Sequence, residues 1–252
     1  MNITRIVAPN PGPFTGAGTN SYVLVSGGEA AVVDPGPLLD SHLDAIRSTV
    51  GDLTVVGVLV THHHLDHAPA ANPLAAEYGV PSYGYGNYGG FQAIPAVADG
   101  DRVPVGTEMI EVLHTPGHTA DSMCFAVADG VLTGDTVKAG TTVVVEDMSA
   151  YLTTLERLAG LAPTRIFPGH GDIIDDPPRV LAEYITHRLA REEQVAASLA
   201  AGPMETRQVV EAVYPDLDPA LEPLAMQSAT AHLRKLVDDG RVSLHGEEWA
   251  LR

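Results

Sequence analysis

The stretch GVLVTHHHLDHA, at residues 57–68, constrains this chain more than any other part of its sequence. An apolar run typical of a buried strand stops at Thr61, and four histidines and one aspartate follow within six positions. Because side chains alternate along a strand, His62 and His64 are predicted to point to one side and His63 to the other. Imidazole and carboxylate groups are usual zinc ligands, so the stretch predicts a metal site at a strand end; the alternative is a polar loop of solvated histidines.

Three later segments repeat this arrangement of an apolar run followed by a metal-binding type of residue in a glycine-containing turn. His118 lies in LHTPGHTADS, Asp135 in VLTGDT and His170 in IFPGHGD. Taken singly, each has an ordinary interpretation as a turn residue. Their recurrence after successive apolar runs predicts that they meet the first cluster at one edge of a sheet, where the glycines beside His170 let the backbone come close.

Up to about residue 175 the chain alternates between short apolar runs and amphipathic segments. The predicted helices cover residues 39–50, 67–78 and 148–159. The turn Ala128-Asp129-Gly130 lies between two apolar runs and predicts a hairpin, which argues against a purely parallel sheet. The predicted strands lie in SYVLVSG, EAAVVDPG, LTVVGVLVTH, EMIEVLHTPGH, SMCFAVADGVLTGD and TRIFPGH.

Residues 177–252 have a different pattern. Residues 177–201 predict one long helix that Gly202-Pro203 closes, and METRQVVEAVYP and SATAHLRKLVDDG predict two more. RVSLHGEEWALR predicts two short strands around Gly246. Three helices followed by a hairpin are the order of a winged helix. We therefore expect a catalytic domain over 1–176, a connecting helix over 177–201 and a winged-helix-like domain over 202–252.

The charge of the chain argues against some functions. Its 14 basic and 32 acidic residues give a net charge of −18, which favours solubility and opposes general binding of nucleic acids. The single cysteine, Cys124, excludes an intramolecular disulfide, and no apolar stretch approaches the length needed to cross a bilayer. The opening MNITRIVAPNPG lacks the apolar segment of a signal peptide, so we expect a cytoplasmic protein without a membrane segment.

These motifs together resemble those of a known family. THHHLDH matches the T-H-x-H-x-D-H signature of the metallo-β-lactamase superfamily, and TPGHTADS, LTGD and PGHG match its later metal motifs in order. NPGPFTGAGTNSYVL, GTTVVVEDMSAYLTTLERL, HRLAREEQ and the C-terminal unit resemble the β-lactamase-like protein 2 branch. The resemblance extends over nearly the whole chain. It implies an α/β fold, the αββα sandwich, followed by a small winged-helix-like α+β unit.

The resemblance also implies a set of functional residues. The cofactors it implies are two zinc ions, with iron or manganese as alternatives. One ion would be held by His62, His64 and His118, and the other by Asp66, His67 and His170, with Asp135 bridging them. Asp34, in AVVDPG, matches a position behind the metal loop where a carboxylate orients an imidazole, or else it is a turn residue before Pro35. Asn20, Thr141 and Thr142 match segments at the metal mouth, where they contact substrate or form loop hydrogen bonds.

Such a site predicts hydrolysis. Two cations about 3.5–4 Å apart lower the pKa of a bridging water and create a hydroxide nucleophile. Asp66 is the predicted catalytic residue, since it could orient that hydroxide and shuttle its proton. The expected substrate is an ester, thioester or related acyl bond, on a small molecule or an acyl carrier.

Three other functions remain alternatives at this point. The branch resemblance allows a single-strand-specific endoribonuclease, although the chain from Ala201 onward has five basic and nine acidic residues, a net charge of −4. That acidic unit is better suited to cover one side of the active-site mouth or to form a homodimer contact. The further alternatives are a mono-iron enzyme that oxidises persulfides, like some relatives, and a non-catalytic binding module.

Overall fold

The structure is a computed structural model that describes residues 1–140 and 142–252. It divides into two compact units. The first comprises Met1–Pro116, Asp121–Val143 and Ala162–Val180, and the second comprises Gly117–Ala120, Val144–Leu161 and Leu181–Arg252. Within the described ranges, no helix combines the length and the apolar character that crossing a membrane would need.

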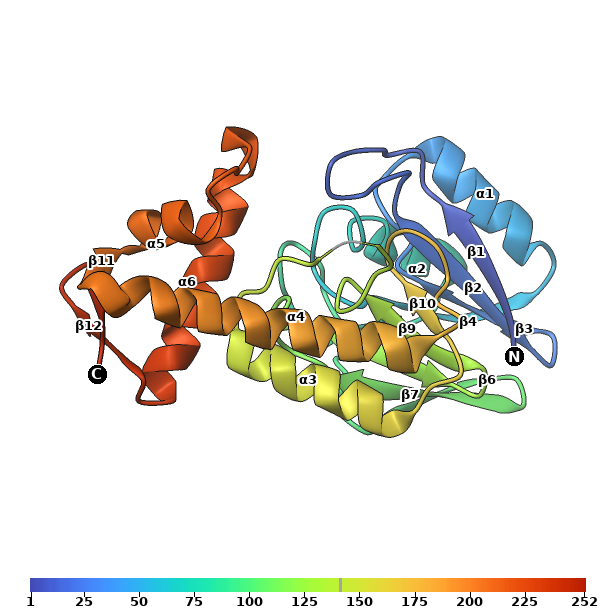
Figure 1. Cartoon of the computed structure of the whole chain (residues 1–252). Coiled ribbons are helices and arrows are strands. Elements are labelled where there is room, and N and C mark those ends of the chain that lie inside the picture. The colour runs from blue at the N-terminus through green and yellow to red at the C-terminus, as the bar shows by residue number, and fades with distance from the viewer. Residues whose placement is uncertain (141) are drawn as a thin grey trace. The chain divides into compact units, whose positions relative to one another are not determined.

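The first unit contains two five-stranded sheets, and both are mixed. In the first sheet the strands follow one another in chain order; β1–β2 and β2–β3 are antiparallel pairs, and β3–β4 and β4–β5 are parallel pairs (Figure 1). Three of its strands are longer than five residues, and β5 has only two. The strands are β1 (Asn2–Val7), β2 (Asn20–Ser26), β3 (Glu29–Val33), β4 (Thr54–Leu59) and β5 (Ser82–Tyr83).

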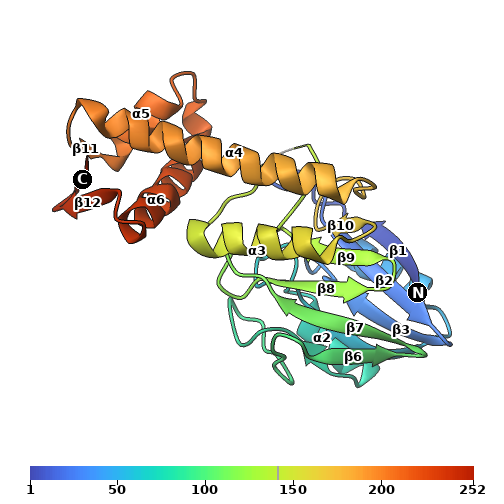
Figure 2. The same ribbon diagram turned by 60° about the horizontal axis from the view of Figure 1, so that its bottom comes forward.

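The second sheet has the order β10-β9-β8-β7-β6, and Figure 2 shows β6 to β9 side by side. Its only parallel pair among the described strands is β9–β10. The predicted hairpin at Ala128-Asp129-Gly130 is confirmed, because it joins β8 to β9. The strands are β6 (Arg102–Val105), β7 (Glu108–His114), β8 (Met123–Val127), β9 (Gly130–Gly134) and β10 (Ile166–Pro168).

The alternation of side chains along the strands divides the core of the first unit into two clusters. Leu24 of β2 is buried in a cluster with Phe125 of β8, and this cluster joins the two sheets. Its neighbour Val23 points to the opposite face, where it packs with Ile46 of α1 (Asp40–Val50) and Leu74 of α2 (Ala71–Tyr78). Burying a side chain of this size stabilises a fold by roughly 1.5–3 kcal/mol. The first sheet is therefore buried on both faces, which holds its strand ends in place.

Helices α1 (Asp40–Val50) and α2 (Ala71–Tyr78) lie on the outer face of the first sheet. The prediction of a helix over 67–78 is wrong at its start, because α2 begins only at Ala71. The chain before it forms a tight turn in which the backbone N–H groups of His67 and Ala68 both donate to the carbonyl oxygen of His64. The histidine-rich stretch thus lies in a turn between β4 and α2.

The second unit contains the remaining helices and a three-stranded antiparallel sheet of order β11-β13-β12. The two-stranded wing around Gly246 is confirmed, and the short strand before α5 was not predicted, since two residues are too few for a sequence signal. Trp249, the only tryptophan of the chain, packs with Leu233 and Val209 in its core. The elements are α3 (Met148–Leu161), α4 (Pro177–Ser198), β11 (Met204–Glu205), α5 (Thr206–Val213), α6 (Glu222–Asp238), β12 (Val242–His245) and β13 (Glu248–Leu251).

His232 of α6 is fully buried in the second unit, and neither of its ring nitrogens has a hydrogen-bond partner among the described residues. Burial and several nearby cations lower the pKa of His232 to about 3. A carboxylate oxygen of Glu192 lies 3.9 Å from its Nδ1, but burial and the cations outweigh that attraction. The cations and titratable neighbours are Arg188, Arg191, Lys235 and His187.

We expect this neutral histidine to make folding of the second unit sensitive to acid. As the pH falls below about 6.5 the unfolded chain takes up the proton first, so stability is lost from there down toward pH 3, by at most about 1.4 kcal/mol per pH unit. His232→Met should flatten the dependence between pH 6 and 4, and His245→Gln, at an exposed position, should leave it unchanged. Urea unfolding followed by Trp249 fluorescence measures this; equal slopes in wild type and His232→Met would contradict it.

Candidate metal centre

Parallel strand pairs place the candidate metal ligands at common edges of the two sheets. In the first sheet β3 and β4 run parallel, so Asp34 and Thr61 follow them at the same edge. In the second sheet β9 and β10 run parallel, so Asp135 and His170 follow them at the same edge. The sequence prediction that these turns meet is therefore explained by the direction of the strands.

Four side chains of the first unit converge on one point. Nε2 of His67 lies 3.3 Å from Oδ2 of Asp66, 3.5 Å from Oδ1 of Asp135 and 3.4 Å from Nε2 of His170. Nε2 of His170 lies 3.2 Å from each of the same two carboxylate oxygens. His62 joins this group, because one ligand atom each of His62, His67 and Asp135 lie within 4.8 Å of one another.

The hydrogen bonds behind these rings leave lone pairs facing the centre. Nδ1 of His67 lies 2.9 Å from Oδ2 of Asp34, and Nδ1 of His170 lies 3.2 Å from the carbonyl oxygen of Gly18. Both oxygens accept, so each Nδ1 keeps a proton and each Nε2 is the nitrogen that can give its lone pair to a cation once its own proton is displaced. Oδ1 of Asp135 is buried and accepts no hydrogen bond from the described residues. Such a convergence of electron-rich atoms fits a divalent cation.

The pKa directions agree with a cation site. Burial opposes ionisation of Asp66 and Asp135, but the imidazoles of His170 and His67 outweigh it and hold both carboxyl pKa values below their usual range. Burial likewise opposes protonation of His67 and His170, but Asp34, Asp135 and Asp66 raise the pKa of His67, and Asp135 and Asp66 that of His170. Metal binding at such a site has to displace protons, so metal affinity should rise with pH.

His62 and His64 point to the same side, as predicted, although β4 ends before them. Nε2 of His62 lies 3.0 Å from Nδ1 of His64, whereas Nδ1 of His63 turns away and lies 2.8 Å from Oδ1 of Asp121. His118 belongs to the second unit, where its Nδ1 donates to the carbonyl oxygen of Val144 over 2.7 Å. Because Nδ1 of His118 carries the proton in that hydrogen bond, the ring has the tautomer in which Nε2 can act as a metal ligand.

Asp34 lies directly behind the metal loop, which is the turn that carries His62 to His67, and it is 2 % exposed. Its Oδ1 accepts from the backbone N–H of Thr61 over 2.7 Å. Its Oδ2 accepts from the hydroxyl of Thr61 over 2.6 Å and from Nδ1 of His67. The carboxylate therefore fixes the orientation and the tautomer of the His67 ring.

Several residues that support the site were not identified from the sequence. Thr19 is fully buried and its hydroxyl donates to Oδ2 of Asp66 over 2.9 Å. The hydroxyl of Ser21 donates to the backbone oxygen of Asp34 and lies 2.7 Å from Nε2 of His42. Both hydroxyls flank Asn20 in the segment TNSY, which is the only sequence signal that points to them.

Asn20 forms loop hydrogen bonds, which was the second of its two predicted roles. Its side-chain N–H groups donate to the carbonyl oxygens of Pro168 and Gly171, each over 2.9 Å, and it is 1 % exposed. Asn20 thus holds the turn that carries His170. Thr142 is exposed, and Thr141 lies outside the described residues, so a substrate contact by these two threonines stays a prediction.

Lys138 is a further residue that sequence reasoning missed. It is 8 % exposed, and its Nζ lies 3.8 Å from Oδ2 of Asp135 and 3.3 Å from the carbonyl oxygen of Phe14. A lysine three positions after Asp135, in a segment otherwise without charge, was the available signal. Its ammonium group places positive charge beside Oδ2 of Asp135, whereas His67 and His170 lie beside Oδ1.

Gly169 is where the backbone approaches the site most closely. A Cβ there would lie 2.7 Å from Oδ1 of Asp135 and 2.7 Å from Cε1 of His67. We expect Gly169→Ala to displace a ligand and lower metal affinity about 10- to 100-fold, the usual cost of disturbing the groups around a metal. Gly160→Ala is the control, because a Cβ at that position of α3 meets nothing within 4 Å. Zinc titration against a chromogenic chelator measures the change; equal affinities would show that the turn adapts.

Comparison with known proteins agrees with the fold. Residues 14–170 match the family described as the metallo-beta-lactamase superfamily, and residues 206–249 match the beta-lactamase associated winged helix domain. A chain that matches this superfamily and has relatives named as thioesterases is a metal-dependent hydrolase. The chain belongs to the metallo-β-lactamase superfamily and carries its associated winged helix domain.

Two curated relatives and one solved structure match nearly the whole chain. A Beta-lactamase-like protein 2 homolog of Caenorhabditis elegans is 32% identical over 95% of this chain and 85% of the relative. An atrochrysone carboxyl ACP thioesterase of Aspergillus chevalieri is 34% identical over 96% of this chain and 82% of the relative. A beta-lactamase domain protein from Burkholderia ambifaria superposes with a TM-score of 0.87 at 24% identity, over 99% of this chain and 91% of that one, which supports the fold.

Proposed function

We propose that this protein hydrolyses acyl thioesters with two divalent metal ions, and that both ions are zinc. The observation that carries the proposal is the convergence of lone pairs from Asp66, His67, Asp135 and His170 on one point. In this proposal Asp135 would serve as a ligand to both metals. The proposed ligands are His62, His64 and His118 for the first metal, and Asp66, His67 and His170 for the second.

The residues of the chain have distinct roles in this reaction. When bound, the cations lower the pKa of a water between them and polarise the substrate carbonyl oxygen. Asp66 is the proposed acceptor of the water proton, because its side chain is 27% exposed while that of Asp135 is 11% exposed, so it can exchange protons with solvent. The hydroxyl of Thr19 holds the Asp66 carboxylate in place over 2.9 Å.

Two observations favour an acyl substrate over RNA. The net charge of −18 opposes the approach of a polyanion. The relative that is 34% identical over 96% of this chain carries a thioesterase name, with an acyl carrier protein as the bearer of its substrate. An acyl group linked to a carrier or to a small thiol is therefore the proposed substrate class.

The test combines metal removal with a choice of substrates. Protein stripped by a chelator and titrated with zinc should release thiol from acyl N-acetylcysteamine thioesters only as zinc is restored, with full activity at two zinc ions per chain. The same preparations should leave a labelled single-stranded RNA intact. Zinc-dependent cleavage of the RNA, with no thiol released, would show that the protein is a nuclease and not a thioesterase. Activity that requires one iron ion and oxygen would show that the reaction is an oxidation and not a hydrolysis.

A further inference from the structure

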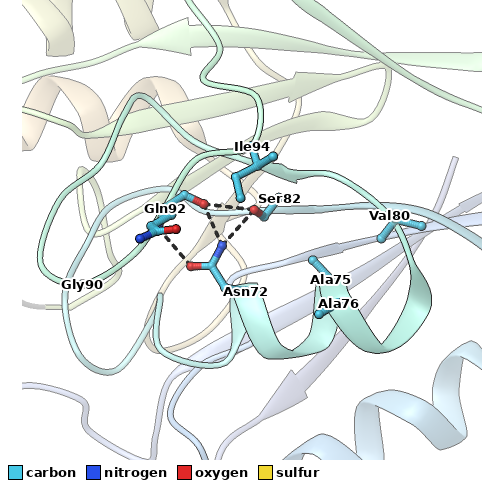
Figure 3. A pocket seen from close by; sticks show the side chains of 8 residues that line it. All are labelled: Asn72, Ala75, Ala76, Val80, Ser82, Gly90, Gln92 and Ile94. Atoms are coloured by element: carbon cyan, nitrogen blue, oxygen red, sulfur yellow. Dashed lines mark hydrogen bonds between the residues drawn. The ribbon is translucent and has the colours of Figure 1, made fainter.

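A glycine-rich loop beside the metal loop has a rigid base. Residues 84–91, GYGNYGGF, form the tyrosine loop, and Asn72 of α2 holds its base (Figure 3). Oδ1 of Asn72 accepts from the backbone N–H of Gln92 over 2.9 Å, and its Nδ2 donates to the Gln92 carbonyl over 2.7 Å and to the Ser82 hydroxyl over 3.0 Å. The ends of the loop are therefore fixed to a helix of the first unit.

The aromatic residues of the tyrosine loop do not share one environment. Phe91 is 5% exposed and belongs to the core cluster under α1 and α2. Tyr85 and Tyr88 are 38% and 37% exposed. The loop is thus anchored by one aromatic ring while it presents two others partly to solvent.

The two exposed tyrosines continue a row of rings that starts at the metal loop. The rings of His64 and His63 lie 5.1 Å apart, and those of His63 and Tyr88 are stacked at 6.0 Å. The rings of Tyr88 and Tyr85 lie 6.4 Å apart, and Tyr85 is stacked on His114 at 4.1 Å with an angle of 7° between the planes. We call His63, Tyr88, Tyr85 and His114 the ring array; it begins one residue from two candidate ligands.

Asp121 and the backbone at Gly89 fix the position of His63 in the ring array. Oδ1 of Asp121 lies 2.8 Å from Nδ1 of His63 and fixes the direction of that ring. Gly89 has a φ of +53°, and a Cβ there would lie 2.7 Å from Cδ2 of His63, so the loop packs against His63 as closely as a glycine permits. Each tyrosine therefore has one face supported by a histidine and keeps a fixed position relative to the metal loop.

We propose that Tyr85 and Tyr88 form the surface on which a planar, unsaturated acyl group of the substrate lies while its thioester carbonyl is at the metals. This inference rests on the proposed function and names the class of acyl group. Aromatic rings gain about 0.5–1.5 kcal/mol from stacking beyond their buried area. Because the array is fixed to the loop of His62 and His64, it positions the acyl chain and sets specificity without touching the reacting atoms.

The same rings could stack on nucleobases, but the charge around them favours an acyl group. Between Thr61 and Asp121 the chain has one arginine, no lysine and seven acidic residues. A surface that binds single-stranded nucleic acid combines stacking rings with a cationic groove. The array lacks that groove in its own stretch of the chain, so a neutral planar group fits it better.

The test compares two thioesters of the same thiol, 2-naphthoyl and acetyl N-acetylcysteamine, in zinc-loaded protein. Tyr88→Leu keeps an apolar side chain and removes the planar ring, and Tyr88→Phe restores the ring. We expect Tyr88→Leu to lower kcat/KM for the naphthoyl thioester about tenfold, mainly through KM, and to change the acetyl thioester less than twofold. Tyr88→Phe should behave as wild type. Met109→Ala, which shortens a 51% exposed side chain near the start of β7, is the matched control.

Binding of 2-naphthoate, measured by calorimetry, tests the array even if no thioester is cleaved. Wild type and Tyr88→Phe should bind it about tenfold more tightly than Tyr88→Leu does. If Tyr88→Leu loses naphthoate binding while wild type cleaves no thioester, the array proposal is kept and the proposed reaction is rejected. If Tyr88→Leu changes kcat/KM equally for both thioesters and leaves the binding constant of 2-naphthoate unchanged, the array proposal is overturned. Weaker binding of single-stranded RNA by Tyr88→Leu, with unchanged naphthoate binding, would assign the rings to nucleobases.

Discussion

Asp135→Asn is expected to lower the rate of thioester hydrolysis by about a thousandfold or more. Its Oδ1 lies 3.2 Å from Nε2 of His170 and 3.5 Å from Nε2 of His67, so it is, with Asp66, one of two carboxylates shared by these histidines. The amide keeps the shape but removes the negative charge that would hold two cations together. Loss of the charge stabilisation that a metal gives a transition state costs several kcal/mol, and about 4 kcal/mol is a factor of a thousand.

Metal content and rate should fall together in this variant. Atomic absorption is expected to show fewer zinc ions per chain than in wild type, while circular dichroism shows the same fold. Asp172→Asn is the control, because Asp172 lies two positions after His170 but its side chain is 91% exposed. A variant that lost activity but kept both zinc ions would show that Asp135 acts on the substrate and does not hold metal.

Asp34→Asn should weaken metal binding by about 10- to 100-fold although Asp34 is not among the proposed ligands. An amide at this position can still accept from the backbone N–H of Thr61, but its NH2 group would face Nδ1 of His67. His67 then has to move its proton from Nδ1 to Nε2, the nitrogen that faces the metal. Asparagine tolerates the φ of +47° at this position, so the backbone is preserved.

Asp34→Ala separates orientation from stability. It leaves three buried donors without an acceptor, two from Thr61 and one from His67, and each unsatisfied donor costs about 1–3 kcal/mol. We therefore expect Asp34→Ala to lower the melting temperature strongly and Asp34→Asn to lower mainly the zinc affinity. Calorimetric zinc titrations and thermal unfolding of both variants measure this. Zinc affinity equal to that of wild type in Asp34→Asn would contradict the role of Asp34 in fixing the tautomer.

The candidate ligands were predictable from the sequence because they follow strands. His62, Asp135 and His170 each come after an apolar run, and parallel strand pairs bring such positions to one edge. The alternation of His62, His63 and His64 also held, although the strand ends at Leu59. Strand periodicity extended past the last backbone hydrogen bond of the ladder. The predicted helix over 67–78 failed at its start because its first residues close the turn that presents the histidines.

The supporting residues were less predictable, since their local sequence gives only weak signals. Thr19 reaches Asp66 from 47 positions away in the chain, and Lys138 lies three positions after Asp135 without a motif that marks it. Tyr85, Tyr88 and Phe91 are aromatic residues at intervals of three positions, and only the fold shows that Phe91 is the buried one. The domain boundaries at 176 and 201 and the assignment of His118 to the first metal stay predictions, as does Asp66 as the catalytic residue.

The hydrogen bonds from Asn20 to the turn of His170 have a mechanical consequence. Asn20 begins a strand of the first sheet and His170 follows a strand of the second, so the two sheets are tied at the edge where the ligands lie. His67 and His170, 103 positions apart, face each other across the same seam. A cation held by both acts as a cross-link between the layers, comparable to a disulfide that closes a long loop. A metal ion bound here would therefore also hold the two sheets together.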